Sequence, residues 1–241
     1  MKHVAIDIGA SGGTVYLGDL TPTDCDVAEV HSFDNYPVVR DGRYVWDLAA
    51  LPDRIVEGIR AADREAGSVD TVAIDTWGLD FGLVADGEVL RLPTSYRDPE
   101  ATAERDEVFE AVGKRRLFDE TGITNWATPN TLWQLYTLAA REPDLLERAE
   151  VLLPMPQLLS SLLGGRETGE VTVASTTQMV DPERRAWATD LLEALSLPTA
   201  LLPDLEEPGQ SLGPVTDDVA ASLSATPELV STASHDTAAA V

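Results

Sequence analysis

Three aspartates follow short apolar segments of the sequence: Asp7, Asp75 and Asp236. Carboxylates at strand ends converge on the crevice of an α/β sheet, where ligands bind. Grouped there, they predict either two or three metal-bound acids, or one acid that orients a metal ion beside another that acts as a general base. The alternative is that each aspartate caps the turn or helix that follows it. For Asp75 taken alone, capping is the favoured interpretation.

A glycine-rich turn, GASGGT, follows Ile8 and leads into a second apolar run. It lacks the lysine of a Walker loop, and a strand follows where a dinucleotide fingerprint needs a helix. It can instead form a hairpin turn whose backbone N–H groups face an anion. Ser11 and Thr14 would add hydroxyl donors, and Asp7 could hold a Mg²⁺ ion that bridges phosphates. An ordinary hairpin with a surface aspartate is the alternative, which the turn alone favours.

The polar group His235-Asp236-Thr237 lies near the end of the sequence, just after Thr232 and Ser234. The pattern places Asp236 at a strand-to-helix junction. There its carboxylate can accept the proton of an alcohol, provided that an electrophile is held in line. The alternative is that Asp236 caps the helix and His235 is a satisfied neighbour.

An aromatic residue and a glycine, Trp77 and Gly78, follow the apolar run 69–76. Tryptophan rings stack on sugars, and glycine lets hydroxyl groups reach the backbone. Trp77 is also a core candidate, because tryptophan fills cores more often than it binds ligands. Arg97 and Asp98 predict either a structural ion pair or a hydroxyl-binding pair. The other tryptophans are core candidates first: Trp46, Trp126, Trp133 and Trp187.

The first half of the sequence reads as strands followed by a helix. Strands are expected at 3–8, 14–20, 26–33 and up to about 46, the first two as a hairpin. A helix with apolar spacing begins near Leu51, carries Pro52 in its first turn and is closed by Gly67. The run 69–76 predicts a central strand buried on both faces, and Asp86-Gly87 predicts a tight hairpin.

The second half is more helical. Helical segments are expected at 99–112, 114–121, 130–141, 156–163 and 186–195. A strand is expected at 151–155, a loop at 202–214, and a strand at 228–234. Strand pairs with crossover helices and a later helical insertion predict an α/β domain around a mixed sheet.

The charge balance restricts the partners. The 241 residues include 42 acidic and 17 basic side chains, a formal net charge of -25, with Lys2 and Lys114 the only lysines. Such a field repels nucleic acid and anionic membranes, so a phosphate site must use backbone N–H groups and a metal ion. We interpret this surface as the salt-adapted surface of a halophile. The charge also disfavours a nuclease that uses the three aspartates as metal ligands.

The remaining composition indicates a soluble, cytoplasmic protein. Cys25 is the only cysteine, which excludes an intramolecular disulfide and a cysteine zinc site. The N-terminus shows no signal segment, and no apolar stretch reaches membrane-spanning length. A homodimer is compatible with the composition.

The order of several motifs resembles the FGGY family of carbohydrate kinases: IDIGASGGTVYL, IDTWGLDF, SYRD, LLPMPQLLSSLLGG, TVASTTQMVD and ASHDTAAAV. The resemblance covers residues 4–241, and DTWGLDF and ASHDTAAAV are its most specific parts. Within the family, the motifs look most like the rhamnulokinase branch and next like the L-fuculokinase branch. The implied fold is actin-like and ribonuclease-H-like, with two domains and with sugar and ATP bound between them.

The resemblance also implies roles for the matching residues. Asp7 would orient Mg²⁺, and Asp236 would be the general base that takes a proton from the hydroxyl attacking the γ-phosphate. The loop at the ATP phosphates would comprise Ala10, Ser11, Gly12, Gly13 and Thr14. The sugar contacts would be Gly78, His235, Asp236 and Thr237, with Trp77 and Arg97 as further candidates. The implied reaction is ATP-dependent phosphorylation of a ketose or polyol, with L-rhamnulose, converted to L-rhamnulose 1-phosphate, as the first candidate.

Three features depart from the family pattern. Thr14 stands where rhamnulokinases usually have arginine, and Gln157 stands where they usually have aspartate. The sequence also stops at Val241, where the family continues into a second domain with the adenine-binding elements. Residues 1–241 are therefore expected to be the N-terminal domain, inactive without a C-terminal ATP-binding domain. A non-catalytic, sugar-binding half-kinase is the alternative from another class.

Overall fold

The first three strands form an antiparallel meander, and buried and exposed residues alternate along the first of them. In the computed structural model, which describes residues 1–241, β1 (Lys2–Ile8), β2 (Gly12–Leu20) and β3 (Cys25–Asp34) pair in sequence. Val4, Ile6 and Ile8 are buried, while Ala5 and Asp7 between them are exposed. The predicted hairpin and third strand are confirmed, and one face of β1 remains open.

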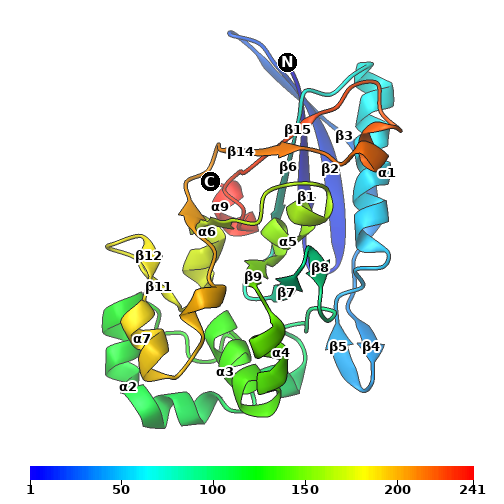
Figure 1. The fold of residues 1–241 in the computed structure, drawn as a ribbon. Helices are drawn as coiled ribbons and strands as arrows, with labels where there is room; N and C mark the ends of the chain where they lie inside the picture. The colour runs from blue at the N-terminus through cyan, green and yellow to red at the C-terminus, as the bar shows by residue number, and fades with distance from the viewer.

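Three later strands complete a mixed sheet. β6 (Thr71–Thr76) runs parallel to β1, β15 (Glu228–Val230) runs parallel to β6, and β14 (Ser211–Pro214) is antiparallel to β15. The strand order is β14-β15-β6-β1-β2-β3 (Figure 1). Burial of β6 on both faces is confirmed only at its end, because Thr71 and Ala73 are half-exposed. The mixed central sheet is confirmed.

One face of this sheet is covered by α1 (Leu51–Ala66). Ile55 and Ile59 point into a core of 25 residues shared with the strands. As predicted, Pro52 lies in the first turn, and Gly67 ends the helix with a φ of 80°, which suits glycine. Gly58 faces β2 so closely that an added Cβ would lie 2.5 Å from Val15 Cγ2.

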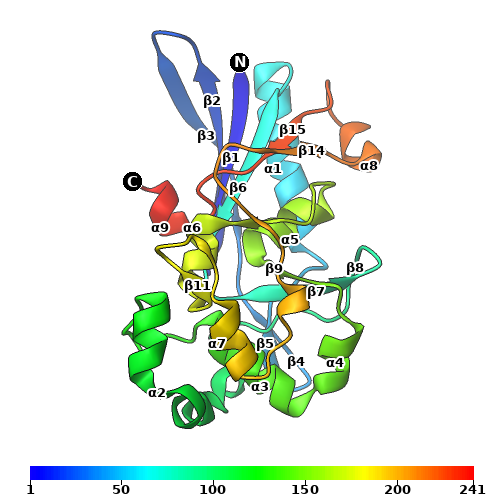
Figure 2. The ribbon, with the colours of Figure 1, turned by 60° about the vertical axis from the view of Figure 1, so that its left-hand side comes forward.

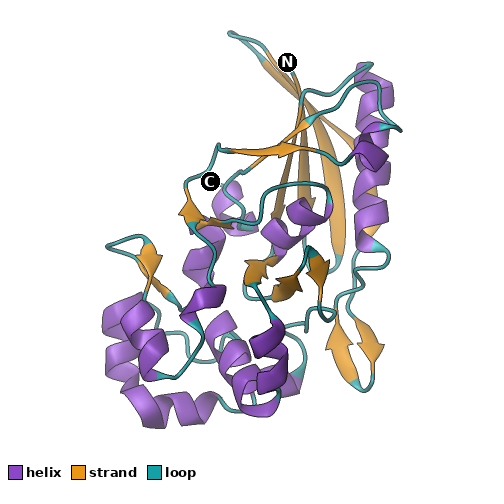
Figure 3. Ribbon diagram, viewed as in Figure 1, coloured by secondary structure: helices purple, strands orange, loops and turns teal.

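A second, largely helical body lies at one end of the sheet (Figures 2 and 3). It has a core of 19 buried residues of its own, which includes Leu117 and Trp133. Gly113, with a φ of 76°, breaks α2 where the sequence predicted two helical segments. The main elements are β7 (Phe81–Ala85), β8 (Glu88–Val89), β9 (Val151–Pro154), α2 (Arg105–Thr121), α3 (Thr131–Arg141), α4 (Pro143–Arg148) and α7 (Thr189–Ala194).

Shorter elements complete the fold. They are β4 (Val38–Arg40), β5 (Arg43–Val45), η1 (Pro99–Thr102), α5 (Met155–Leu162), β10 (Gly169–Glu170), α6 (Val171–Ala174), η2 (Ser175–Thr177), β11 (Val180–Asp181), β12 (Ala186–Trp187), η3 (Thr199–Leu201), β13 (Leu205–Glu206), α8 (Asp217–Ala220) and α9 (Asp236–Ala239). The loop predicted at 202–214 is wrong, since it contains β13 and β14. The helix predicted at 186–195 begins only at Thr189, because residues 186–187 pair with β11. No helix is long and apolar enough to span a bilayer.

Candidate active site

Parallel pairing of β1 with β6 sets two carboxylates side by side. The register places Asp7 beside Asp75, one residue before each strand ends. Asp75 is buried and Asp7 is exposed. Asp75 lies inside β6, and the next element along the chain is the strand β7 and not a helix that it could cap. The capping interpretation of Asp75 is therefore wrong, because pairing with a strand 68 positions away in register decides its place.

The last segment brings the third aspartate to the same end of the sheet. The N–H of Thr76 donates to the carbonyl of Ser234 at 3.0 Å, and Thr76 forms a bridge with His235. Helix α9 therefore starts beside the end of β6 (Figure 2). Asp236 is its first residue, and Asp236 Oδ1 accepts a hydrogen bond from the Thr237 hydroxyl at 3.0 Å. His235 Nε2 lies 3.4 Å from the same oxygen.

Burial and neighbouring negative charge raise the pKa values of two of these carboxylates, Asp7 and Asp75. Burial raises the pKa of Asp75 to about 7, and the charges of Asp7 and Asp236 add to the effect. The pKa of Asp7 is also raised, by partial desolvation and then by the charge of Asp236. The pKa of Asp7 therefore responds to the charge of Asp236, although Asp7 is exposed. No lysine or arginine is among the groups that set these two pKa values.

This electrostatic environment fits a Mg²⁺ ion. Clustered negative charge without a basic partner is stabilised by a divalent cation. Mg²⁺ commonly takes one or two protein carboxylates and completes its shell with water and phosphate oxygens. No cluster of three or more protein ligands is assembled in the structure, so the protein alone does not enclose a metal. Asp7, open to solvent, suits the one-carboxylate mode.

The glycine-rich turn lies next to Asp7, which is in register with Thr14 on β2. Asn35 braces the turn, since its backbone N–H donates to the Ser11 carbonyl at 3.2 Å and its Nδ2 donates to the Gly9 carbonyl at 2.8 Å. The backbone N–H groups of Ala10 and Ser11 donate no hydrogen bond within the chain. They are therefore available to an anion, as the phosphate-binding interpretation requires.

Packing against Phe33 accounts for two glycines of this turn, Gly12 and Gly13. A Cβ at Gly13 would lie 2.3 Å from the Phe33 ring, and one at Gly12 would lie 3.1 Å from the Phe33 carbonyl oxygen. Gly13 is thus required by the close approach of β3 as well as by any ligand. The hairpin and the phosphate-binding interpretations are compatible with each other.

A cavity of about 410 Å³ adjoins Asp236. Four of the predicted sugar contacts line it together: Trp77, Gly78, His235 and Asp236. The helical body supplies the opposite wall, which the sequence did not predict: Leu79, Tyr96, Ile123, Thr128, Asn130 and Thr176. The cavity thus joins the carboxylate end of the sheet to apolar and hydroxyl-bearing side chains, a composition suited to a small polyhydroxylated ligand.

Arg97 does not share this cavity. Its side chain is exposed, and its guanidinium carbon lies 5.7 Å from the centre of the Tyr96 ring. The predicted Arg97–Asp98 ion pair is wrong, because Asp98 is buried and pairs with Arg43 at 2.8 Å. Asp98 also accepts from Glu100 N and caps η1. The carboxylate therefore has a structural role, and Arg97 stays a candidate through its place beside Tyr96.

Trp77 is both a core residue and a wall of the cavity. It is 5% exposed, and its ring centre lies 4.1 Å from that of Trp46. Its indole N–H donates to Asp80 Oδ2 at 3.0 Å. The core and the ligand interpretations of Trp77 are therefore compatible.

The protonation of Asp80 predicts how stability changes with pH. Burial raises its pKa to about 6, although hydrogen bonds from Gln134 and Trp46 oppose the rise. The folded state then keeps a proton between pH 3.8 and about 6 that the unfolded state has lost. The free energy of unfolding should therefore fall as pH rises through this window, by up to about 3 kcal/mol from this group.

Urea unfolding of wild type and Asp80→Asn between pH 4.5 and 7 isolates this contribution. Other carboxyls, including Asp75, titrate in both proteins, so only the difference between their pH profiles belongs to Asp80. We expect a flatter profile for the variant. Parallel profiles would contradict the assignment.

Gly78 is required by a close contact with η2. A Cβ at this position would lie 2.5 Å from Thr176 Oγ1 and 3.0 Å from Thr176 Cβ. Gly78→Ala should therefore displace one wall of the cavity, lowering stability by about 1–3 kcal/mol. We also expect sugar affinity to fall about tenfold or more in the full-length protein.

Calorimetric titration with sugar and urea unfolding measure the two effects. Gly18→Ala is the matched control, because a Cβ at Gly18 would lie 3.7 Å from the nearest atom, an ordinary contact. If Gly78→Ala behaved like Gly18→Ala, the contact with Thr176 would not shape the cavity.

Two further residues of the site lacked any recognisable sequence signal. Asn130 is buried, and its Nδ2 donates to the Thr176 carbonyl at 2.7 Å, while its Oδ1 has no partner. Glu170 is fully buried and accepts from Ser234 N at 3.0 Å, so it anchors the segment that carries Asp236. The partners in these two contacts are separated by 46 and 64 residues along the chain. Local periodicity in the sequence cannot predict contacts over such separations.

The chain resembles known carbohydrate kinases over its whole length. Residues 3–241 match the model of the N-terminal domain of the FGGY family of carbohydrate kinases. A rhamnulokinase of Oceanobacillus iheyensis is 35% identical over 240 residues, which cover 99% of this chain and 51% of that protein. A rhamnulokinase of Bacteroides thetaiotaomicron is 33% identical over 240 residues, covering 98% of this chain and 49% of that protein.

Solved structures agree with this comparison at the level of the fold. A ligand-bound xylulose kinase from Lactobacillus acidophilus superposes with a TM-score of 0.81 at 16% identity, over 96% of this chain and 48% of that one. A glycerol kinase from Plasmodium falciparum with ADP gives a TM-score of 0.74 at 15% identity, over 95% and 48% of the two chains. The chain spans about half the length of these relatives. It belongs to the FGGY family of carbohydrate kinases and corresponds to the family's N-terminal domain.

Proposed function

We propose that this chain is the sugar-binding, base-carrying half of a kinase that transfers the γ-phosphoryl group of ATP to a ketose. The observation that carries the proposal is the position of Asp236. It lines the cavity and also interacts electrostatically with Asp7 and Asp75 at the sheet end, where the glycine-rich turn lies. An alcohol bound in the cavity and a phosphate bound at the glycine-rich turn would thus both lie close to the Asp236 carboxylate.

In this reaction the protein contributes mainly by positioning the reactants and stabilising charge. The sugar hydroxyl loses its proton to the Asp236 carboxylate as its oxygen forms a bond to the γ-phosphorus. The bond from that phosphorus to the bridging oxygen breaks, and ADP leaves. The N–H groups of Ala10 and Ser11 would bind phosphate oxygens. Mg²⁺ held by Asp7 would supply the positive charge that the chain itself lacks.

L-rhamnulose is the first candidate substrate and L-rhamnulose 1-phosphate the product. The support comes from the two rhamnulokinases at 33–35% identity. L-fuculose and other sugars of the family are the runner-up substrates. Residues 1–241 would act together with a C-terminal domain that holds most of the nucleotide, in keeping with the half-length coverage of the relatives.

A substrate panel tests this proposal. The full-length protein is assayed with Mg·ATP and L-rhamnulose, L-fuculose, D-xylulose or glycerol, and kcat/KM is compared. We expect L-rhamnulose to give the highest value. Preference for another sugar would replace the substrate assignment, and no sugar-dependent ADP formation with any family substrate would favour a non-catalytic half-kinase.

A further inference from the structure

Asp80 is a buried carboxylate with no cation beside it. It is 2% exposed, and it accepts four hydrogen bonds from neutral donors. Oδ2 accepts from Trp46 Nε1 at 2.7 Å, from Trp77 Nε1 at 3.0 Å and from Tyr96 N at 3.1 Å. Oδ1 accepts from Gln134 Nε2 at 2.9 Å. A single side chain thus joins four separate segments of the chain.

Two of these four donors belong to residues that line the sugar-binding cavity, Trp77 and Tyr96. A third, Gln134, holds the cavity indirectly, because its Nε2 also donates to the Leu79 carbonyl at 3.2 Å. Leu79 lines the cavity with a φ of 83°, a backbone region that disfavours leucine. The network therefore fixes the Trp77 indole ring, the backbone N–H of Tyr96 and the strained turn at Leu79 relative to one another.

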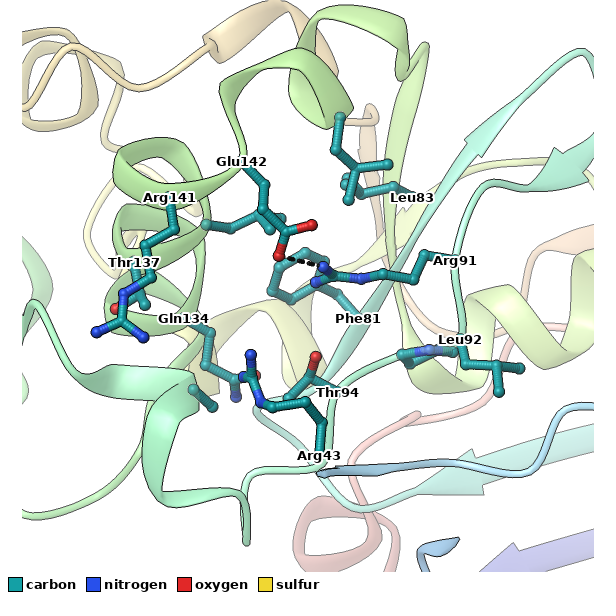
Figure 4. A pocket seen from close by; sticks show the side chains of 14 residues that line it. Arg43, Phe81, Leu83, Arg91, Leu92, Thr94, Gln134, Thr137, Arg141 and Glu142 are labelled. Carbon is teal, nitrogen blue, oxygen red and sulfur yellow. Dashed lines mark hydrogen bonds and ion pairs between the residues drawn. The ribbon is translucent and has the colours of Figure 1, made fainter. Parts of the chain in front are cut away.

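Gln134 also touches a second cavity, which Figure 4 shows from close by. Its three arginines are each paired with a carboxylate: Arg43 with Asp98, Arg91 with Glu142, and Arg141 with Glu100 and Glu104. The positive charge there is matched within the chain, so this crevice presents no free cationic group to a ligand. Gln134 instead makes its hydrogen bond to another side chain with Asp80.

A buried carboxylate without a cation is costly, and hydrogen bonds offset only part of that cost. Backbone strain clusters at active sites and ligand-binding segments, and a satisfied buried polar network makes the local structure rigid. We infer that Asp80 is a positioning residue of the sugar site, which fixes the Trp77 ring and the Tyr96 backbone as walls of the cavity. The inference rests on the proposed function. It adds a role for Asp80, the second aspartate of the DTWGLDF motif, which is buried and does not itself line the cavity.

The test compares two buried aspartates in the full-length enzyme. Asp80→Asn removes an acceptor for neutral donors. Asp63→Asn is the control at the end of α1, away from the cavity. Asp63 is 5% exposed, and its Oδ2 accepts from Ser224 N at 3.0 Å and Ser224 Oγ at 2.9 Å, while its Oδ1 has no partner. We expect the KM for sugar to rise about 10- to 100-fold in Asp80→Asn, with the KM for ATP unchanged. Asp63→Asn keeps one oxygen that can accept both bonds, and it should leave both KM values unchanged.

Gln134→Ala keeps the inference testable if Asp80→Asn does not fold. It removes one of the four donors and should raise the KM for sugar about 3- to 10-fold, again without changing the KM for ATP. Tryptophan fluorescence provides a second readout: in wild type it should titrate near pH 6 as Asp80 protonates beside Trp46 and Trp77, and this step should be absent in Asp80→Asn.

The outcomes separate the inference from the proposed function. An unchanged KM for sugar in a folded Asp80→Asn or Gln134→Ala, beside an active wild type, overturns the inference alone. Equal losses toward sugar and ATP, matched by Asp63→Asn, also overturn it, since they indicate general destabilisation. A wild type that phosphorylates no sugar overturns the proposed function and the inference with it.

Discussion

Asp236→Asn should lower kcat of the full-length kinase by about 10²- to 10⁴-fold, the usual range for loss of a general base. Asparagine is nearly isosteric with aspartate and retains an oxygen that can accept from Thr237, but it cannot take the proton of the attacking hydroxyl. Sugar affinity should therefore stay within about threefold of wild type, because the lost interaction acts in the transition state. Steady-state kinetics and calorimetric sugar binding measure the two effects.

Asp217→Asn is the matched control for this change. Asp217, like Asp236, is the first residue of a four-residue helix, but it is exposed on α8 and does not line the cavity. It should retain wild-type kcat. Normal turnover in Asp236→Asn would contradict the base assignment, and a parallel loss of sugar binding would indicate a binding role instead.

Glu170→Ala should lower the free energy of unfolding by about 2–4 kcal/mol, since it removes a helix cap and leaves buried donors unpaired. Glu170 accepts from Thr172 N at 2.8 Å and Val173 N at 3.3 Å at the start of α6, and from Ser234 N at 3.0 Å. Its loss should also release the segment of Ser234 and Asp236, so kcat/KM for sugar should fall with stability.

Urea unfolding and steady-state kinetics on the same preparations check both effects. Glu193→Ala, at an exposed position of α7, controls for the loss of an acidic side chain from a helix. It should change stability by less than about 0.5 kcal/mol. A Glu170→Ala variant as stable and as active as Glu193→Ala would show that the bond to Ser234 does not hold the site.

Local patterns in the sequence predicted much of the fold. Apolar runs and the glycine-rich link predicted the β1–β2 hairpin and the strand at 26–33, and glycines marked the end of α1 at Gly67 and the break in α2 at Gly113. These features depend on neighbouring residues and on backbone angles that glycine permits, which a sequence expresses directly. The short strands β13 and β14 were missed because residues 202–214 have the composition of a loop and pair only through distant partners.

The site was only partly predictable for the same reason. The position of each aspartate after an apolar segment predicted that Asp7, Asp75 and Asp236 lie at one end of the sheet. The structure places them there, because Asp7 pairs in register with Asp75 and Thr76 bridges to His235. Asp80 and Glu170 act through partners such as Gln134 and Ser234, 54 and 64 residues away. Such contacts arise from tertiary packing, so no local pattern marks them. The roles of the glycine-rich turn and of Asp236 in catalysis, like the salt-adapted surface, stay predictions.

The central claim is that a sugar hydroxyl bound beside Asp236 receives the γ-phosphoryl group of ATP. Transfer of radiolabelled phosphate from [γ-³²P]ATP to L-rhamnulose by the full-length protein, with Asp236→Asn in parallel, tests it most directly. The account predicts that wild type forms one labelled sugar phosphate for each ADP. With Asp236→Asn, the rate of labelling should be lower by about 10²-fold or more. Equal labelling by both proteins, or label released only as inorganic phosphate, would contradict it.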